Sequence, residues 1–245
     1  MLIAILSDIH GNMEALSEVL REIDRVDPDE VFSLGDNIGY GPDPEQVMQI
    51  IQARRIPSVL GNHELALNKE SFIKWFNPVS AQAVFHFKSR LSASSIHHIR
   101  SYPLSRVWGE TRMVHGMPPS SPAVYLHQVS DQRIRERLMG IRERIVFIGH
   151  THILALIEDD GKKIIRKAWD GARTLLDRKR RYLVNAGSVG QPRDGDNRAR
   201  FLLYDTEAAL LEARYVPYDY QKTAAKIIQE GLPRSFAEKL QQGGA

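Results

Sequence analysis

Short apolar runs, each followed by a polar cluster, recur along the first two thirds of the chain. They lie at residues 2–6, 31–34, 58–60, 113–114 and 145–148. An apolar run of this length, closed by a glycine or a polar turn, is typical of a buried strand. Because ligands of open α/β sheets bind beyond the carboxyl ends of the strands, we expect the polar clusters to meet at one sheet edge.

Helical periodicity alternates with these runs in the first third of the chain. Apolar residues at helical spacing predict a helix from about Asn12 to Val26. A second predicted helix runs from about Asp43 to Arg55, with Pro44 in its first turn. The strands of this region are predicted at 2–7, 31–35 and 57–60. The alternation predicts a βαβαβ unit with parallel strands and right-handed crossovers.

Residues 64 to about 102 are predicted to be helical, and most of the chain after them to be β. The helical segment leaves directly after His63, so we expect it to roof the site and to control access to it. Further helices are predicted near 131–143 and at 220 to about 230, and residues 241–245 as a frayed tail. Further strands are predicted at 104–108, 111–115, 145–149, 153–158, 163–169, 173–177, 181–185, 200–205 and 210–216. Without a repeat or a linker, residues 1–245 are expected to form one domain with a helical insert at about 64–102.

The composition is that of a globular protein with a substantial core. The 245 residues are 42% apolar and 26% charged. The absence of cysteine excludes disulfides and thiolate metal ligands, and it fits a reducing compartment. The apolar stretch Leu2–Leu6 is far shorter than the ~20 residues of a membrane span, and no basic region precedes it. We therefore expect a cytoplasmic protein with no membrane partner.

The charge distribution does not predict a nucleic-acid partner. The net charge of +3 arises from 33 basic and 30 acidic residues that are interspersed along the chain. The densest basic cluster, Arg178 to Arg181, fits the solvated end of a hairpin. The oligomeric state stays open.

The polar clusters combine hard oxygen and nitrogen donors. Two aspartates, one asparagine and four histidines follow the predicted strands, namely Asp8, His10, Asp36, Asn62, His115, His150 and His152. Such a mixed set suits Mn, Fe, Zn, Co or Ni better than copper or an iron–sulfur cluster. Four other histidines lack a strand-end context and are interpreted as structural: His86, His97, His98 and His127.

Five sequence blocks together resemble the signature of the calcineurin-like metallophosphoesterase superfamily. They are Asp8-Ile9-His10, Gly35-Asp36, Gly61-Asn62-His63-Glu64, Val114-His115-Gly116 and Gly149-His150-Thr151-His152, in the family's order. The segment Asn185–Arg193 is similar to a further segment of small bacterial and archaeal members, and we expect it to support the site through backbone hydrogen bonds. The resemblance implies an α/β four-layer sandwich, in which two mixed β-sheets are flanked by helices.

The resemblance also implies a site for two divalent metal ions, with manganese favoured. One ion would take Asp8, His10 and His152, and the other Asn62, His115 and His150. Asp36 would bridge them, since a carboxylate has two oxygens. Such a pair can lower the pKa of a shared water from about 15.7 toward 7, and the resulting bridging hydroxide would attack phosphorus in line. Asp8 and His10 occupy alternate positions, so they point the same way only if the backbone between them is extended.

His63 is implied to be the catalytic group that stabilises the transition state and protonates the leaving oxygen. An unperturbed imidazole pKa near 6.5 suits that acid role near neutrality. Glu64 either orients His63 or serves as a carboxylate at the start of a helix.

The stretch after Asp36 departs from two subfamilies of the superfamily. Protein Ser/Thr phosphatases and symmetrical diadenosine tetraphosphate hydrolases continue with Asp-Arg-Gly, whereas residues 37–42 here contain no arginine. The resemblance therefore implies a phosphodiesterase for nucleotide-type or broad phosphoester substrates. A phosphoprotein phosphatase and a dinucleoside polyphosphate hydrolase are the enzymatic alternatives.

Two residues outside the ligand set are candidate substrate contacts. Arg193 would supply the missing cation, unless it is a surface arginine, and Tyr40 would lie against a base or sugar, unless it only packs. Some members of the superfamily, including a retromer subunit, are scaffolds rather than enzymes and tend to lose the acid histidine or some ligands. The presence of His63 and all seven ligand candidates favours an enzyme over a metal-binding scaffold.

Overall fold

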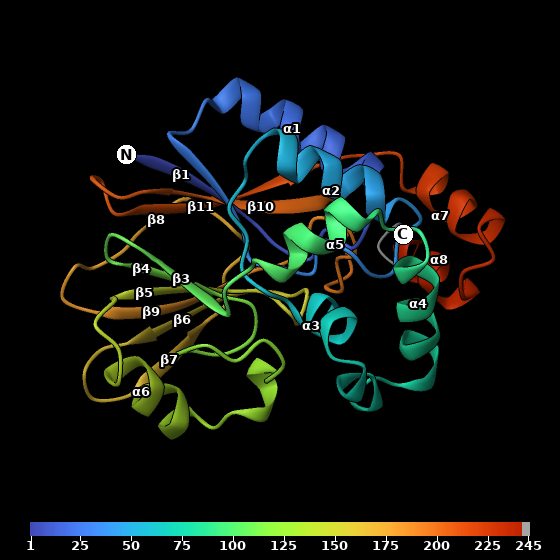
Figure 1. The fold of residues 1–245 in the computed structure, drawn as a ribbon. Coiled ribbons are helices and arrows are strands. Elements are labelled where there is room, and N and C mark those ends of the chain that lie inside the picture. Colours follow the sequence, from blue (N-terminus) through green and yellow to red (C-terminus); the bar gives the residue numbers. More distant parts are fainter. Residues whose placement is uncertain (242–245) are drawn as a thin grey trace.

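Two β-sheets face each other across the main core, and helices cover their outer faces (Figure 1). The computed structural model describes residues 1–241, apart from the side chain of Gln82. The first sheet has the order β2-β1-β10-β11-β8, formed by Glu30–Ser33, Leu2–Leu6, Ala199–Asp205, Leu210–Val216 and Thr174–Leu175. The second has the order β3-β4-β5-β9-β6-β7, formed by Ser105–Trp108, Thr111–Val114, Ile145–Ile148, Arg181–Ala186, Leu154–Asp159 and Ile164–Lys167. Helices α1 (Met13–Val26) and α2 (Pro44–Ala53) cover the first sheet, and α6 (Asp131–Met139) covers the second. The predicted four-layer sandwich is confirmed.

Alternation along the central strands explains their nearly continuous apolar sequences. In β1, Ile3 and Ile5 point into the core between the sheets, while Ala4 and Leu6 point toward the helices outside. The same alternation places Ile145 and Phe147 of β5 between the sheets. Val146 and Ile148 point the other way and pack against α6. Successive side chains of a strand point to opposite faces, so a strand covered on both faces must be apolar throughout.

Both sheets are mixed. Strand β1 pairs parallel with β2 and antiparallel with β10, and β5 pairs parallel with β4 and β9. The strand predicted at 57–60 is wrong, because this stretch makes only an isolated parallel bridge between Ser33 and Ser58. The chain turns away at once, and the Leu60 amide bonds to the Pro103 carbonyl instead.

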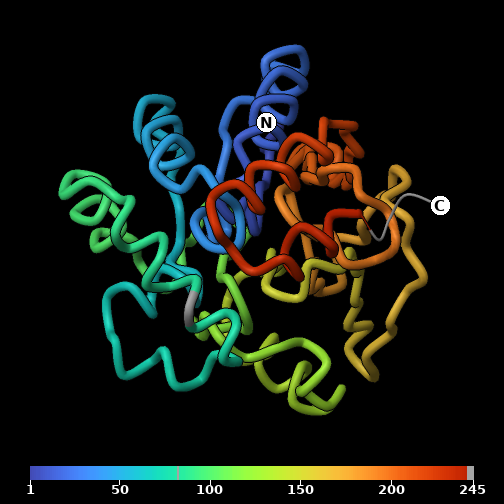
Figure 2. The backbone as a smooth tube through the Cα atoms, turned by 90° about the vertical axis from the view of Figure 1, so that its right-hand side faces the viewer, coloured from blue at the N-terminus to red at the C-terminus, as the bar shows by residue number. Residues whose placement is uncertain are grey.

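A group of helices closes one end of the sandwich, the end that faces the viewer in Figure 2. The segment predicted to be helical forms α3 (Asn62–Asn68), the 3₁₀ helix η1 (Glu70–Trp75), α4 (Pro78–Lys88) and α5 (Ala93–Arg100). Helices α7 (Tyr220–Gln229) and α8 (Arg234–Gln241) pack into the same apolar cluster. Helix α8 was not predicted, and Gln241 belongs to it rather than to a frayed tail; the rest of that tail lies outside the described residues.

Most other element boundaries agree with prediction to within a few residues. The helix predicted at 131–143 already ends at Met139, where Gly140 follows. The strands predicted at 163–169 and 173–177 shorten to β7 and to the two residues of β8. No helix within residues 1–241 is both long and apolar enough to cross a membrane.

Candidate metal centre

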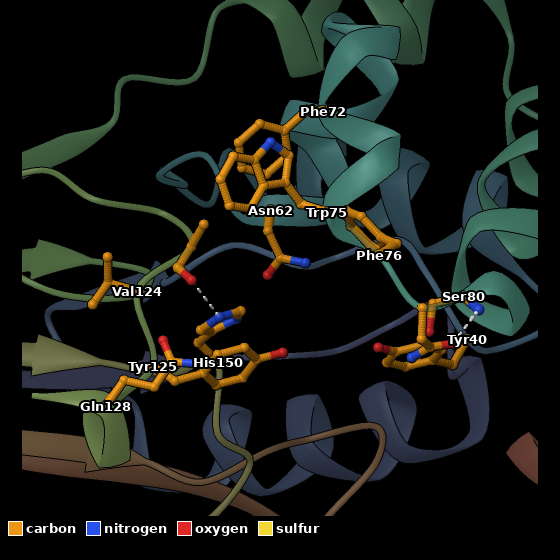
Figure 3. Close-up of a pocket in the computed structure, with 12 residues that line it drawn as sticks. Tyr40, Asn62, Phe72, Trp75, Phe76, Ser80, Val124, Tyr125, Gln128 and His150 are labelled. Carbon is orange, nitrogen blue, oxygen red and sulfur yellow. Dashed lines mark hydrogen bonds between the residues drawn. The ribbon is translucent and has the colours of Figure 1, made fainter.

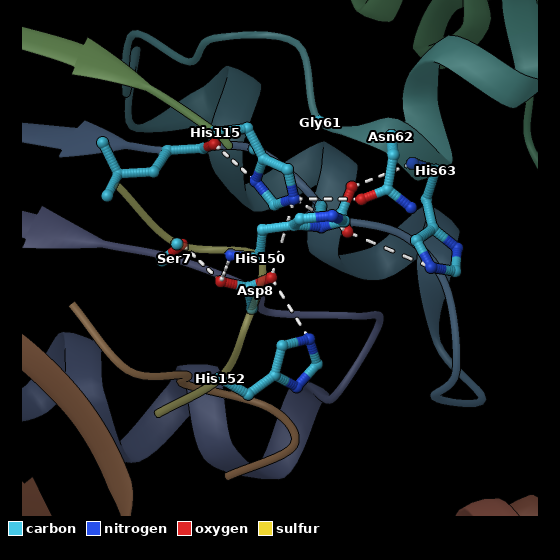
Figure 4. A network of polar contacts seen from close by, with 12 residues as sticks. Ser7, Asp8, Gly61, Asn62, His63, His115, His150 and His152 are labelled. Atoms are coloured by element: carbon cyan, nitrogen blue, oxygen red, sulfur yellow. Dashed lines mark hydrogen bonds and ion pairs between the residues drawn. The ribbon is translucent and has the colours of Figure 1, made fainter. Parts of the chain in front are cut away.

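The loops that follow β1, β2, β4 and β5, together with the start of α3, bring seven polar side chains to one buried place (Figure 4). Candidate ligand atoms of Asp8, His10 and His152 lie within 4.8 Å of one another, and so do those of Asp36, His115 and His150. Asn62 joins the second group, because its Oδ1 lies 3.1 Å from Nε2 of His115. The structure thus brings together all seven residues singled out from the sequence, in the two predicted groups.

Each of the four histidines engages one ring nitrogen with the main chain. Three of them use Nδ1: His10 lies 3.2 Å from the Ile38 carbonyl oxygen, His115 lies 2.9 Å from that of Leu34, and His152 lies 2.6 Å from that of Gln191. His150 uses Nε2, which lies 3.2 Å from the carbonyl oxygen of Ala123. A carbonyl only accepts, so in a neutral imidazole the proton resides on the nitrogen that faces it. The other nitrogen is then free as a metal ligand, as is usual for histidines that bind metals.

In the first group, the atoms that the framework leaves free are acceptors that crowd together. His10 and His152 place their Nε2 atoms 3.0 Å apart, although Nδ1 of each already bonds to a carbonyl. Oδ1 of Asp8 is buried without a hydrogen-bond partner and lies 3.3 Å from Nε2 of His152. Three acceptor atoms so close together repel one another unless a cation lies between them. The donor set and its surroundings therefore fit a divalent metal ion.

In each of the two aspartates, one carboxylate oxygen accepts hydrogen bonds from neighbouring protein groups and the other faces the histidines. Oδ2 of Asp8 accepts hydrogen bonds from Ser7 Oγ at 2.5 Å and the His150 amide at 3.0 Å, which leaves Oδ1 toward the imidazoles. In Asp36, Oδ1 accepts from the His63 amide at 2.9 Å, and Oδ2 lies 3.2 and 3.8 Å from Nε2 of His115 and His10. Only one oxygen of Asp36, Oδ2, thus faces both groups.

Electrostatics inside the cluster follow from burial and from the two carboxylates. Burial lowers the pKa of His150 to about 3 and that of His152 to about 4. Burial acts the same way on His115, but Asp36 and Asp8 outweigh it and raise the pKa of His115 to about 9. The carboxylates thus favour positive charge at their centre, which a bound divalent cation would provide.

Unusual backbone geometry aims the ligand candidates. Five of the seven have a positive φ, namely Asp8 (52°), His10 (50°), Asp36 (51°), His150 (68°) and His152 (62°). Left-handed backbone costs a non-glycine residue about 1–3 kcal/mol, and it clusters at functional sites. The backbone between Asp8 and His10 is not extended; two left-handed residues flanking Ile9 bring both side chains to the centre instead.

Two glycines let the main chain approach the carboxylates closely. A Cβ on Gly61 would lie 2.1 Å from Oδ1 of Asp36, and one on Gly149 would lie 1.9 Å from Ser7 Oγ. Neither position can therefore carry a side chain without displacing an aspartate or the serine that holds it.

Glu64 holds the loop that carries Asp36. Its carboxylate accepts hydrogen bonds from the amides of Asp36, Asn37 and Gly61, at 2.9, 2.7 and 3.1 Å. Burial and the nearby Asp36 raise the pKa of Glu64 to about 8, while the amide donors act in the opposite direction. Of the two roles considered for Glu64, its hydrogen bonds fit the carboxylate at the start of a helix, and they extend that role to the neighbouring loop.

His63 lies at the edge of the cluster, among aromatic rings. Its Nε2 lies 3.9 Å from Oδ2 of Asp36, and its Nδ1 is buried without a hydrogen-bond partner. Its ring meets those of Tyr40 and Phe76 edge-on, at centroid distances of 4.7 and 4.9 Å. Burial lowers the pKa of His63 to about 3, so the unperturbed value assumed from the sequence does not apply and the imidazole is neutral at pH 7.

A cavity of about 520 Å³ opens beside the cluster and borders Asn62 and His150 (Figure 3). One wall comes from η1 and the start of α4, with Phe72 and Trp75, and the opposite wall from the loop before η2 (Leu126–Gln128), with Tyr125. The helical segment predicted to roof the site thus borders the approach to it. Phe72 and Tyr125 were not identified from the sequence, because they follow no strand and share no spacing with the ligand candidates.

The two candidate substrate contacts lie next to each other. The ring of Tyr40 lines the cavity and lies 4.5 Å from that of His10, and the guanidinium of Arg193 lies 5.6 Å from the Tyr40 centroid. Burial, and then the charge of Arg193, lower the pKa of His152. Lys239 and Phe236 of α8 pack on Tyr40 as well, a contact that no signal in the sequence indicated.

The segment Asn185–Arg193 supports the first loop, as expected. The amides of Val189 and Gly190 donate to the carbonyls of Ser7 and Asp8, both at 2.9 Å. Ser188 Oγ donates to the Asp8 carbonyl as well, also at 2.9 Å. These bonds help to hold Asp8 in its strained conformation.

Comparison with known proteins places the chain in a family. The sequence model of the calcineurin-like phosphoesterase superfamily domain matches residues 1–209. An uncharacterized protein of Methanocaldococcus jannaschii is 31% identical over 242 residues, which cover 98% of this chain and 97% of that protein. The crystal structure of a metallophosphoesterase from Sphaerobacter thermophilus aligns with a TM-score of 0.83 and 32% identity, covering 99% of both chains. A hypothetical protein of Pyrococcus horikoshii shares the fold, with a TM-score of 0.80, 18% identity and coverage of 99% and 98%. The chain belongs to the calcineurin-like phosphoesterase superfamily.

Proposed function

We propose that the protein is a dinuclear metal-dependent phosphodiesterase that acts on nucleotide-type or broad phosphoester substrates. The observation that carries this proposal is the shared design of the cluster. In Asp8, Asp36 and each of the four histidines, one polar atom is held by the framework and the other points to the centre. Buried acceptors arranged in this way have no structural use without cations.

The ligand assignment follows the two groups. Asp8, His10 and His152 would hold one ion, and Asn62, His115 and His150 the other, with Oδ2 of Asp36 between them. Two bound divalent cations, for which we propose manganese, would activate a water molecule and offset the charge of the phosphoryl oxygens. Asn62 contributes a neutral oxygen, which keeps the site attractive to an anionic phosphoester.

His63 acts on the substrate rather than on the ions. In the substrate-free protein its imidazole is neutral and therefore carries one N–H. From its place beside Asp36 it would donate this N–H as a hydrogen bond to the phosphoryl group or the leaving oxygen, and so stabilise the negative charge that develops there. The backbone amide of His63 donates a hydrogen bond to Oδ1 of Asp36, and this bond holds the imidazole beside the centre.

The surroundings support a diester rather than a monoester as substrate. A phosphomonoester carries about one more negative charge at pH 7 than a diester and calls for additional cationic side chains. Residues 37–42 contain no arginine, and Arg193 is the cation that stacks on Tyr40 beside the centre together with Lys239. A monoanionic phosphodiester suits this modest positive charge.

Hydrolysis of bis-p-nitrophenyl phosphate tests the proposal. We expect p-nitrophenol release that requires added divalent metal, strongest with Mn among Mn, Ni, Co and Fe. We expect His63→Ala to lower kcat by at least about 100-fold, as loss of a general acid or a transition-state hydrogen bond does. His97→Ala, on the exposed side of α5, is the matched control and retains full activity. Absence of metal-dependent turnover with all four metals would support the scaffold alternative.

A further inference from the structure

We propose that the cavity beside the metal centre binds the nucleobase of the phosphodiester substrate, which stacks on Trp75. This inference rests on the proposed function and assigns a part of the substrate that the metal centre itself does not touch. Apart from Asn62 and His150, the side chains that line the cavity lie outside the five sequence blocks that form the metal centre.

The position of the cavity links it to the reacting group. Asn62 and His150, both candidate metal ligands, form part of its lining. Tyr125 stacks on His150 with ring centroids 3.7 Å apart and an interplanar angle of 22°. An ester group at the metal centre therefore has one of its organic substituents directed into this cavity. The volume of about 520 Å³ is within the range of small-molecule sites, about 300–1,000 Å³.

The walls of the cavity are aromatic and partly uncovered. Trp75 is 75% exposed, although it is the largest apolar side chain of η1, and it stacks on Phe72 at 6.4 Å. Figure 3 shows Phe72 and Trp75 on one side of the cavity and Tyr125 on the other. The exposed ring of Trp75 is suited to stack on a planar ring, because every base presents a π face. Tyr125, on the opposite wall, is half-buried and stacks on His150 and His127.

The lack of charged side chains in the cavity lining disfavours other phosphoesters. Within the described part of the chain, its lining contains no lysine, arginine, aspartate or glutamate. The additional phosphates of a dinucleoside polyphosphate would find no cation there, and neither would the acidic side chains of a phosphopeptide. The side chains of Asn77 and Gln128 line the rim and offer amide donors and acceptors to the edge of a base.

Two chromogenic diesters with the same leaving group test the subsite. Methyl p-nitrophenyl phosphate and thymidine 5′-(p-nitrophenyl phosphate) are compared with the full-length protein in excess Mn. We expect the wild type to favour the thymidine ester at least about tenfold in kcat/KM, which corresponds to one stacked base. We expect Trp75→Ala to lose most of this preference, because its KM for the thymidine ester rises. Trp75→Phe keeps part of the preference. Phe85→Ala is the control and keeps all of it. Phe85 is 58% exposed on α4 of the same segment but does not line the cavity.

Direct binding provides a readout that does not depend on turnover. Calorimetric titration is expected to show tighter binding of adenosine 5′-monophosphate than of ribose 5-phosphate to the wild type, and equal binding of both to Trp75→Ala. Equal binding of both by the wild type, or a thymidine preference that survives Trp75→Ala, overturns the base subsite. Failure to hydrolyse either diester overturns the proposed function instead, and the titration then decides the subsite alone.

Discussion

His10 and His152 face each other with their Nε2 atoms 3.0 Å apart, while the Nδ1 of each bonds to a backbone carbonyl. Neither Nε2 carries a proton when both rings are neutral, so the contact is repulsive until a cation lies between them. The strained backbone at both residues maintains the contact. The geometry of these two histidines is thus costly unless a cation is bound between them.

Metal binding is therefore expected to stabilise the fold. A ligand at about 100 times its dissociation constant adds about 2.7 kcal/mol, and at this chain length each kcal/mol shifts Tm by about 2–4 °C. We expect Mn to raise Tm by about 5–10 °C over the EDTA-treated protein, and His152→Ala to abolish most of that shift. His97→Ala is the control and keeps it. A Tm that does not respond to metal in the wild type would contradict this prediction.

Glu64→Gln is expected to loosen the loop that carries Asp36. The amide of the new side chain has only one acceptor oxygen, so at least one of the amides of Asp36, Asn37 and Gly61 loses its partner. We expect a loss of about 2 kcal/mol in the free energy of unfolding, measured in urea, together with weaker Mn binding. Glu70→Gln, on the surface of η1, is the control and leaves both unchanged. Unaltered metal affinity in Glu64→Gln would show that the loop does not need this support.

The ion pair between Glu14 and Lys226 is expected to make stability depend on pH. Burial raises the pKa of Glu14, but the hydrogen bond and charge of Lys226 outweigh it, so the folded-state pKa lies below the usual 4.5. A lowered carboxyl pKa stabilises the fold above the unfolded-state pKa, and the contribution disappears as pH falls through the folded-state value. We therefore expect Glu14→Gln to destabilise the protein at pH 7 and the difference from wild type to shrink as pH falls below about 4.5.

Urea unfolding of wild type and variant at a series of pH values measures this difference. Glu136→Gln, exposed on α6, is expected to show a small difference that stays the same throughout. A Glu14→Gln difference that grows toward acid would mean that Lys226 does not hold the carboxylate in its charged form.

Arg193→Gln is expected to weaken substrate binding more than turnover. Arg193 stacks on Tyr40 beside the centre, and we propose that it contacts a phosphoryl oxygen. A charge-assisted hydrogen bond contributes about 1.5–3 kcal/mol, so we expect KM for bis-p-nitrophenyl phosphate to rise roughly 10- to 100-fold with kcat changed little. Arg198→Gln is the matched control, since Arg198 is exposed and pairs with Asp196. A large fall in kcat at unchanged KM would instead place Arg193 in the chemical step.

The fold and the grouping of the ligand candidates could be predicted because both depend on regular elements. Buried strands such as β1 and β5 need apolar residues on both faces, and this requirement leaves a continuous signal in the sequence. Asp8 and His150 could be assigned to one site from the signature blocks, although the strands before them, β1 and β5, belong to different sheets.

The rest depends on irregular backbone, which leaves no periodic signal. The left-handed conformation of Asp8 and His10 cannot be inferred from residue type, and the aromatic walls of the cavity follow no strand. Helix α8 left a weak signal that was missed: Pro233 precedes a short stretch in which Phe236, Ala237 and Leu240 lie on one helical face. The pKa of His63 depends on burial by distant segments, which no local pattern encodes.

Metal content at equilibrium tests the central claim most directly. After dialysis of the full-length protein against micromolar Mn and removal of free ions, elemental analysis is expected to find two Mn ions per chain in the wild type. Asp36→Asn, whose neutral side chain lacks the charge needed between two cations, is expected to retain at most one. A wild-type protein that binds one ion or none under these conditions, with Ni, Co, Fe and Zn as well as Mn, would contradict the dinuclear centre.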